Sequence, residues 1–113
     1  MRVNLPKPLA IFGERIANAL EYLTRCWALE LAPAGVRVNG VAVGPTESEA
    51  LTGMMGLSME EAEAIKQQDR QQIPLRRRGL PTEIALWIVS FADPAGDWVT
   101  GQVLGIDGGL SRT

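Results

Sequence analysis

The 113-residue sequence has no histidine and only one cysteine, Cys26. Imidazole and thiolate are the usual ligands of zinc, so the chain offers no ordinary zinc site and we assign no metal ligand. The lack of histidine also removes the Ser-His-Asp and Cys-His groups of nucleophilic catalysis. A single cysteine cannot form an internal disulfide framework.

Strong net charge and long apolar runs are also missing. Thirteen acidic and eleven basic residues leave a net charge of −2, which gives no general attraction to nucleic acid or anionic membranes. No apolar run approaches the roughly 20 residues that a membrane span needs. The start, MRVNLPKPLA, lacks the continuous apolar core of a signal peptide. We therefore expect a cytoplasmic protein that binds neither membrane nor nucleic acid, with Arg76-Arg77-Arg78 as a solvated connector rather than a phosphate-binding patch.

The first half of the sequence predicts an arm, a helix and a strand. Residues 1–10 contain two prolines and indicate an irregular arm. Residues 11–32 carry apolar side chains at steps of four and three, which is typical of an amphipathic helix. Residues 36–43 form a nearly continuous apolar run, as expected of a strand that is covered on both faces.

The second half predicts a lid-like segment, a helix and a second strand. Residues 45–72 contain a polar loop and a polar helix, and Ser58 and Glu61 have the spacing of a capping box at its start. Residues 82–92 form a helix that is apolar nearly all round, so it needs burial on more than one side. Residues 102–106 form a short strand before the turn Asp107-Gly108-Gly109.

This order of elements is typical of the α/β class, with about three helices and two parallel strands in one partial domain, 1–113. A two-stranded parallel sheet is a poor free-standing unit, so the sequence indicates one edge of a larger sheet.

Three sequence blocks resemble the short-chain dehydrogenase/reductase family. They are ALEYLTRCWALELAPAGVRVNGVAVGPTES, IPLRRRGLPTEIALWIVSFAD and DWVTGQVLGIDGG, and they span about 17–109 in the order of that family. The resemblance implies the C-terminal part of a Rossmann-like, doubly wound parallel sheet. It also implies an oxidoreductase that uses NAD or NADP on alcohols or carbonyls.

The same resemblance implies cofactor-binding residues after the first strand. The family places Pro-Gly there, followed by a short segment that ends in threonine and holds the nicotinamide end of the cofactor. Here Gly44 matches the glycine, the backbone of Thr46 would meet the carboxamide, and Ser48 takes the threonine position. Val43 and Ser48 depart from the motif.

The departures at the family's catalytic Tyr-x-x-x-Lys are larger. Alignment through Ala-Leu-Glu puts Gly13 at the tyrosine and Ala17 at the lysine, and neither can transfer a proton. Tyr22 and Arg25 lie one to two turns further along, in the wrong register. No G-x-G-x-x-G occurs either, so we assign no catalytic residue and expect the chain to be inactive alone.

An alternative function is a non-catalytic oligomerisation or assembly module. In the family, the elements that correspond to helices 11–32 and 82–92 and to strand 102–106 contact other subunits. A homo-oligomer, either dimer or tetramer, is therefore expected through these elements. The substrate and the choice between NAD and NADP are left open by these residues.

Overall fold

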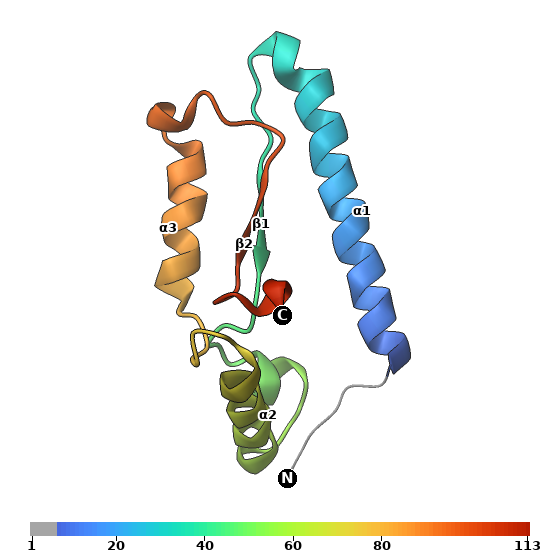
Figure 1. The fold of residues 1–113 in the computed structure, drawn as a ribbon, viewed down its shortest axis with the longest axis vertical. Coiled ribbons are helices and arrows are strands. Elements are labelled where there is room, and N and C mark those ends of the chain that lie inside the picture. The colour runs from blue at the N-terminus through green and yellow to red at the C-terminus, as the bar shows by residue number, and fades with distance from the viewer. Residues whose placement is uncertain (1–6) are drawn as a thin grey trace. The chain divides into compact units, whose positions relative to one another are not determined.

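The computed structural model describes the backbone of residues 7–113 and the side chains from residue 15 onward. Its helices and strands follow the predicted order (Figure 1). They are α1 (Lys7–Leu31), β1 (Gly40–Val43), α2 (Met59–Gln72), α3 (Pro81–Ala92) and β2 (Val103–Ile106). Short helical turns lie between them and after β2. The α/β class is confirmed.

The helix α1 begins earlier than the sequence predicted. The irregular arm was expected to reach residue 10, but the helix already starts at Lys7. Pro8 explains the difference, because the first turn of a helix tolerates a residue without an N–H. The rest of the predicted arm, residues 1–6, lies outside the described residues. The helix ends before Gly35, whose φ of 76° fits the left-handed residue that closes a helix.

The strands β1 and β2 pair side by side as a two-stranded sheet. The Gly40 N–H donates to the Gln102 carbonyl at 2.9 Å, and the Gly44 N–H donates to the Ile106 carbonyl at 3.0 Å. Moving four residues along one strand moves the partner four residues along the other in the same direction, so the strands are parallel.

Regular β1 is only the second half of the predicted strand 36–43. Side chains replace the backbone ladder before it. The Val38 N–H donates to Thr100 Oγ1 at 3.1 Å, and Asn39 Nδ2 donates to the Val99 carbonyl at 2.9 Å. These bonds satisfy the extended backbone without making it regular strand.

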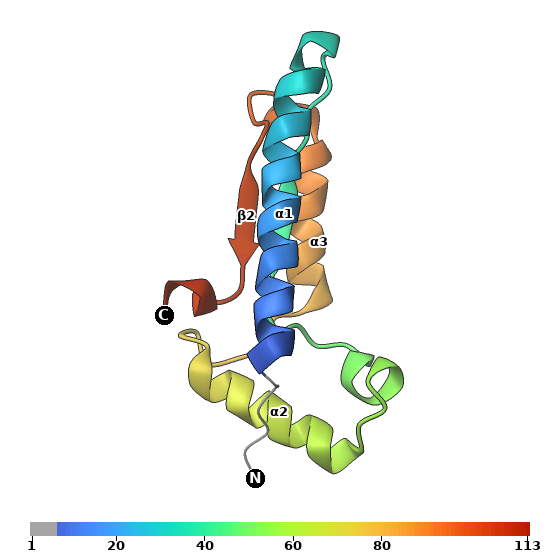
Figure 2. The same cartoon turned by 90° about the vertical axis from the view of Figure 1, so that its right-hand side faces the viewer.

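The chain divides into two compact units. The strand-end unit comprises Val43–Ile84 and Ile106–Thr113, and the helix–strand unit comprises Leu5–Ala42 and Ala85–Gly105, apart from the undescribed start of the chain. Within the helix–strand unit, the strands lie between α1 and α3 (Figures 1 and 2). Gly40 faces Thr24 of α1 and Val103 of β2 closely, since a methyl group there would lie 3.7 Å from each side chain.

The predicted lid segment 45–72 is more structured than expected. The capping box is confirmed, because Ser58 Oγ accepts from the Glu61 N–H at 3.1 Å and Glu61 Oε1 accepts from the Ser58 N–H at 3.2 Å. The preceding segment, predicted as loop, contains one π-helical turn at Ala50–Met54.

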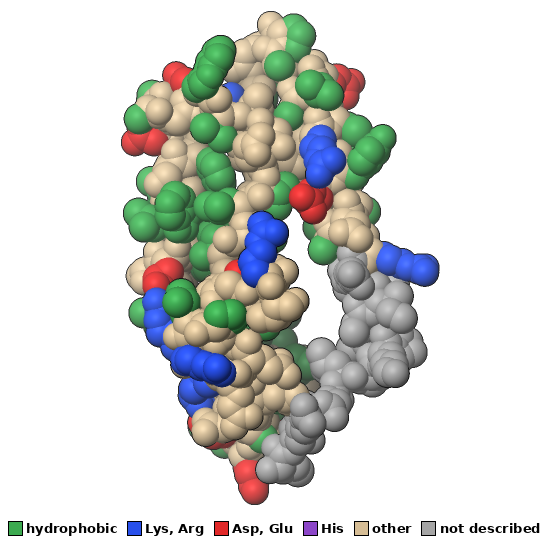
Figure 3. All heavy atoms as spheres, viewed as in Figure 1, with side chains coloured by type: hydrophobic (Ala, Val, Ile, Leu, Met, Phe, Trp, Pro, Cys, Tyr) green, Lys and Arg blue, Asp and Glu red, His purple; other side chains and the backbone are tan. Residues whose placement is uncertain are grey.

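Very few side chains of the described part are buried. Ala28, Ala62 and Ile73 are the apolar ones, and large apolar residues on α3 such as Leu86 and Val89 are 60% and 66% exposed. Figure 3 shows apolar side chains along α3 at the surface. This exposure fits the predicted edge of a larger sheet.

Candidate functional site

The candidate site begins where β1 ends, at Gly44. A methyl group there would lie 2.6 Å from Asp107 Cβ and 2.8 Å from Asp107 Cα, so no other residue fits without moving the backbone. Family resemblance placed this glycine in a cofactor-binding motif. In the structure, the missing side chain lets Asp107, just after β2, approach the backbone of Gly44 closely. Asp107 is itself fixed, because its carboxylate accepts from the Gly109 N–H at 2.9 Å and from the Ser111 N–H at 3.1 Å.

The predicted turn after β2 is therefore a tight one. Hydrogen bonds from Ser111 and from the Gly109 amide lower the pKa of the Asp107 carboxyl. Gly108 has φ of 63°, and a methyl group on it would lie 2.6 Å from Ile73 Cγ2. The Leu75 N–H donates to the Gly108 carbonyl at 3.1 Å. This turn locks the end of β2 onto the segment that follows α2.

Hydrogen bonds fix the side chain and carbonyl of Thr46 and the backbone of both its neighbours. Its Oγ1 donates to the Gly44 carbonyl at 2.9 Å, and its own carbonyl accepts from Arg78 Nη2 at 2.8 Å. Its neighbours pair with Gly79, since the Glu47 N–H donates to the Gly79 carbonyl at 2.8 Å and the Gly79 N–H donates to the Pro45 carbonyl at 2.9 Å. Within the described part of the chain, no acceptor is present for the Thr46 N–H. That amide is a fixed donor without an internal partner.

Ser48 lies two residues further along, in an exposed position. Its Oγ accepts from the Ala50 N–H at 3.2 Å, at the start of the π-helical turn. A serine hydroxyl that accepts one hydrogen bond still has a proton to donate. The segment from Gly44 to Ser48 thus offers the backbone N–H groups of Thr46 and Ser48 and one hydroxyl as donors, which suit an oxygen of a ligand.

A buried arginine, Arg78, contacts this segment, and no local sequence pattern indicated its burial. The prediction of a solvated connector is wrong for Arg78, which is 8% exposed. Its Nη1 donates to Asp69 of α2, and its Nη2 donates to the Thr46 carbonyl. Its Nε lies 3.5 Å from Glu47 Oε1, close enough for an ion pair, but makes no hydrogen bond. The run of arginines looked solvated because these partners are 9 to 32 residues away.

The acidic partners of Arg78 form a small charge network. Burial raises the pKa of the Asp69 carboxyl, and the positive charge and hydrogen bond of Arg78 partly offset that effect. Glu47 also forms an ion pair with Lys66 of α2, in which Glu47 Oε2 and Lys66 Nζ lie 3.2 Å apart. Lys66 and Asp69 lie on one face of α2 with the buried residues Ala62 and Ile73. Through this face α2 contacts Glu47 and Arg78 of the same unit.

The other two arginines of the run also have partners. Arg77 forms a bidentate ion pair with Glu83: Nη1 donates to Oε1 at 2.7 Å, and Nη2 donates to Oε2 at 2.8 Å. This pairing and a hydrogen bond from the Leu80 N–H lower the pKa of Glu83 to about 2. Arg76, in left-handed conformation with φ of 62°, donates to the Gln71 carbonyl.

Gly13 and Ala17 lie one turn apart on α1. Tyr22 is 67% exposed, and no described residue hydrogen-bonds its hydroxyl. Arg25 instead lies 3.8 Å from Glu21, the pair that its spacing predicts. The described residues also hold no cluster of three potential metal ligands, and no described helix is long and apolar enough to cross a bilayer.

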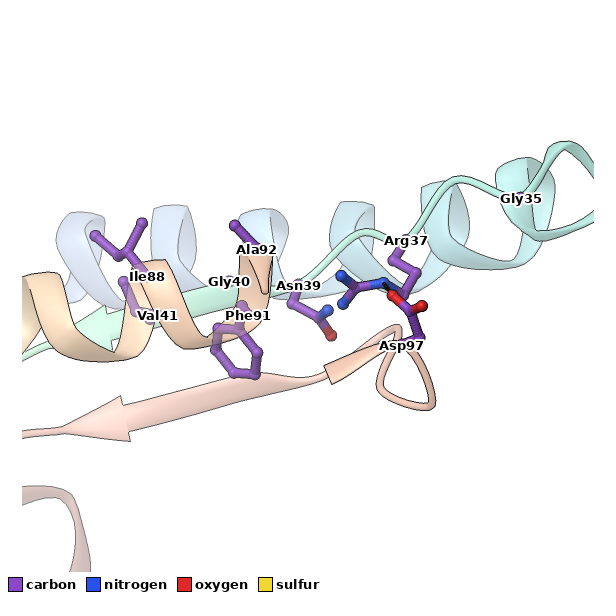
Figure 4. Close-up of a pocket in the computed structure, with 9 residues that line it drawn as sticks. All are labelled: Gly35, Arg37, Asn39, Gly40, Val41, Ile88, Phe91, Ala92 and Asp97. Carbon is purple, nitrogen blue, oxygen red and sulfur yellow. Dashed lines mark ion pairs between the residues drawn. The ribbon is translucent and has the colours of Figure 1, made fainter. Parts of the chain in front are cut away.

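A cavity of about 510 Å³ lies in the helix–strand unit, apart from the candidate site residues (Figure 4). It is lined by residues of β1, α3 and the segments beside them, including Val41, Ile88 and Phe91. Arg37 and Asp97 point toward each other at its end, 3.5 Å apart. Arg37 also donates to the Gly96 carbonyl at 3.0 Å, so this charge is internally satisfied and offers no obvious chemistry.

Comparisons with known proteins agree with the resemblance of the sequence. The family model described as enoyl-(acyl carrier protein) reductase matches residues 16–111. The 3-oxoacyl-[acyl-carrier-protein] reductase of Thermotoga maritima is 40% identical over 88 residues, which is 78% of this chain and 33% of that protein. The chain thus spans about a third of the length of this curated relative.

Two solved structures are similar in fold as well. A short-chain oxidoreductase from Pseudomonas aeruginosa PAO1, described as containing an atypical catalytic centre, is 37% identical with a TM-score of 0.71. The alignment covers 85% of this chain and 38% of that one. A small-chain dehydrogenase in complex with NADPH is 29% identical, also with a TM-score of 0.71, over 85% of this chain and 41% of that one.

Proposed function

The chain belongs to the short-chain dehydrogenase/reductase family, and we propose that it supplies the nicotinamide-facing C-terminal part of an NAD(P)-dependent oxidoreductase. The substrate class is an alcohol or carbonyl compound. Gly44, Thr46 and Ser48 form the cofactor-binding segment in this proposal. The observation that carries it is the Thr46 N–H, a rigidly held donor with no acceptor among the described residues, at the carboxyl end of a parallel strand. Ligands of open α/β sheets gather at such strand ends.

The role of each group follows from its geometry. Gly44 brings the ends of β1 and β2 together, and the Arg78 contact fixes the carbonyl of Thr46. The Thr46 N–H and the Ser48 hydroxyl would then donate to the carboxamide of the nicotinamide ring, orienting the ring. The bound cofactor would supply the hydride. No residue of this chain is assigned to the proton transfer.

We further propose that these 113 residues do not bind the cofactor or catalyse reduction by themselves. A cofactor of this size needs phosphate contacts, and the sequence contains no G-x-G-x-x-G to provide them. The positions of the family's tyrosine and lysine hold Gly13 and Ala17. The cytoplasm, where the dinucleotide is at hand, is the compartment that this proposal implies.

A graft tests the cofactor segment separately from the rest of the chain. Residues 36–109 would replace the matching part of the Thermotoga maritima relative, which keeps its own preceding residues. If the segment contacts the carboxamide, the graft binds NADH or NADPH, and Ser48→Ala weakens binding about fivefold, as expected for one hydrogen bond of about 1 kcal/mol.

A matched hydroxyl provides the control for this graft. Thr52 lies in the π-helical turn, and its Oγ1 reaches only the Glu49 carbonyl, at 3.5 Å. Thr52→Val should therefore leave cofactor affinity within twofold. Equal affinities for the Ser48→Ala and parent grafts would contradict the assignment of Ser48.

A second candidate is the assembly module, in which α1, α3 and β2 join copies of this chain into a dimer or tetramer. The exposed apolar side chains favour it, since Leu20 and Leu86 are 59% and 60% exposed. Monomeric proteins seldom leave such surfaces uncovered. Sedimentation equilibrium distinguishes the outcomes: a discrete oligomer without cofactor affinity supports the module, and a monomer that stays soluble at high concentration contradicts it.

A further inference from the structure

We infer that Arg78 is a positioning residue that fastens the segment Pro45–Glu47 to the helix α2, so that the two hold one fixed arrangement. The inference rests on the proposed function only in that this segment faces the cofactor. It concerns a contact that lies entirely within the strand-end unit.

The guanidinium group of Arg78 contacts both α2 and the segment Pro45–Glu47. Its three nitrogens contact α2 and two adjacent residues of the segment: Nη1 lies at Asp69 of α2, Nη2 at the Thr46 carbonyl and Nε at Glu47. The side chain of Arg78 is 6% exposed, so water does not compete for these contacts. A planar fork of five donors can serve such a set, whereas a lysine ammonium cannot reach all three.

Charged side chains make two of the contacts that hold α2 there. Its buried apolar residues are Ala62 near one end and Ile73 just after the other. Between them, the inward positions carry Lys66, paired with Glu47, and Asp69, paired with Arg78. Ile73 packs against the turn at Gly108, a contact in which Arg78 takes no part. The middle of α2 is therefore held to the strand end by charge.

The Arg78 contact also restrains the backbone of Thr46. Its N–H can orient a ligand only while its peptide plane is fixed. The plane that carries the Thr46 N–H includes the Pro45 carbonyl, which accepts from the Gly79 N–H. The next plane joins the Thr46 carbonyl to the Glu47 N–H, and Arg78 and Gly79 hold it from its two sides, so Arg78 steadies the C-terminal flank of Thr46. Loss of the guanidinium would leave that carbonyl and the Asp69 carboxylate without their partner in a dry site, and both would turn toward water. The segment and the helix would then keep the Lys66–Glu47 ion pair but lose their buried contact.

Amide hydrogen exchange of the full chain, without cofactor, tests this inference. The reporters are the amides of Glu47 and Gly79, which bond the segment, and the reference in the same unit is Leu75, which bonds to the Gly108 carbonyl. Gly101, which donates to the Val38 carbonyl, is the reference in the other unit. Arg78→Met should raise exchange tenfold or more at Glu47 and Gly79 and less than twofold at both references.

Two variants sharpen the test. Arg77→Met removes the neighbouring guanidinium, which pairs with Glu83 and also donates to the Arg78 carbonyl at 3.2 Å. That carbonyl shares a peptide group with the Gly79 N–H, so the control is read at Glu47, whose amide should stay within twofold of the parent chain. Arg78→Lys keeps the charge but not the fork, so it should resemble Arg78→Met rather than the parent. If Arg78→Met loses the helical circular dichroism signal, Asp69→Asn takes its place, because it weakens a single contact of Arg78.

Three results would overturn the inference: unchanged exchange at Glu47 and Gly79, an equal rise at all four amides, or full rescue by Arg78→Lys. An equal rise would mean that Arg78 only stabilises the fold. Because no cofactor is present, a failure of the proposed function leaves this result standing. A failure here likewise leaves the cofactor assignment to the graft experiment.

Discussion

The contact between Gly44 and Asp107 gives the sharpest prediction about the fold. Gly44→Ala adds one methyl group where the structure has no room for it, 2.6 Å from Asp107 Cβ and 2.8 Å from Asp107 Cα. The obstacle includes backbone, and Asp107 cannot retreat easily because its carboxylate caps the following turn. The ends of β1 and β2 must therefore move apart, which strains the last ladder bond from the Gly44 N–H.

The cost follows from the depth of the overlap. Overpacking costs about 1–3 kcal/mol, and a contact against fixed backbone belongs at about 3 kcal/mol. An unfolding entropy of about 2.1 cal/mol/K per residue gives about 240 cal/mol/K for 113 residues. The melting temperature of Gly44→Ala should then fall by about 12 °C.

Thermal unfolding followed by circular dichroism at 222 nm measures this shift. Gly53→Ala is the matched control, because Gly53 lies in the π-helical turn and a methyl group on it meets nothing within 4 Å. Alanine there should be neutral or stabilise by up to about 1 kcal/mol. A Gly44→Ala melting temperature within about 2 °C of the parent would refute the close approach of the strand ends.

Three further perturbations test other parts of the structure. The pKa of Glu83 is about 2 in the folded chain against 4.5 when unfolded, so its pairing with Arg77 stabilises the fold above pH 4.5 and this stabilisation is lost as the pH falls toward 2. Glu83→Gln should therefore reduce the fall in the free energy of unfolding between pH 4.5 and 2, measured by urea unfolding. An unchanged fall would contradict the pairing. Ser58→Ala removes a hydroxyl cap and should cost about 1 kcal/mol in urea unfolding, with faster amide exchange at Glu61; an unchanged Glu61 amide would contradict it. Ile73→Ala empties a fully buried site and should cost about 2–5 kcal/mol, and a loss below 1 kcal/mol would show that the site is not packed.

Local patterns in the sequence predicted the elements well. The capping box at Ser58, the stop at Gly35 and the turn at Gly108 depend on neighbouring residues, so the sequence was enough to locate them. Apolar periodicity located α1 for the same reason, and a stretch that is apolar nearly all round, after Pro81, located α3. The strand 36–43 was predicted too long, because side chains of the distant Thr100 and of Asn39 replace its ladder.

The parts of the site that depend on distant contacts could not be predicted. Arg78 is one of three consecutive arginines, and nothing local separates it from Arg77 at the surface. Its burial results from Thr46 and Asp69, which approach it only in the folded chain. Family resemblance pointed to Gly44, whereas the reason for glycine there, the approach of Asp107, required coordinates.

The most direct test of the account is a titration of the 113-residue chain with NADH and NADPH, read from the anisotropy of the reduced nicotinamide and from quenching of the three tryptophans. We expect no saturable binding up to about 1 mM cofactor; a dissociation constant of about 1 mM corresponds to a binding free energy of only about 4 kcal/mol. Saturable binding of either cofactor would contradict the claim that these residues hold only the nicotinamide end.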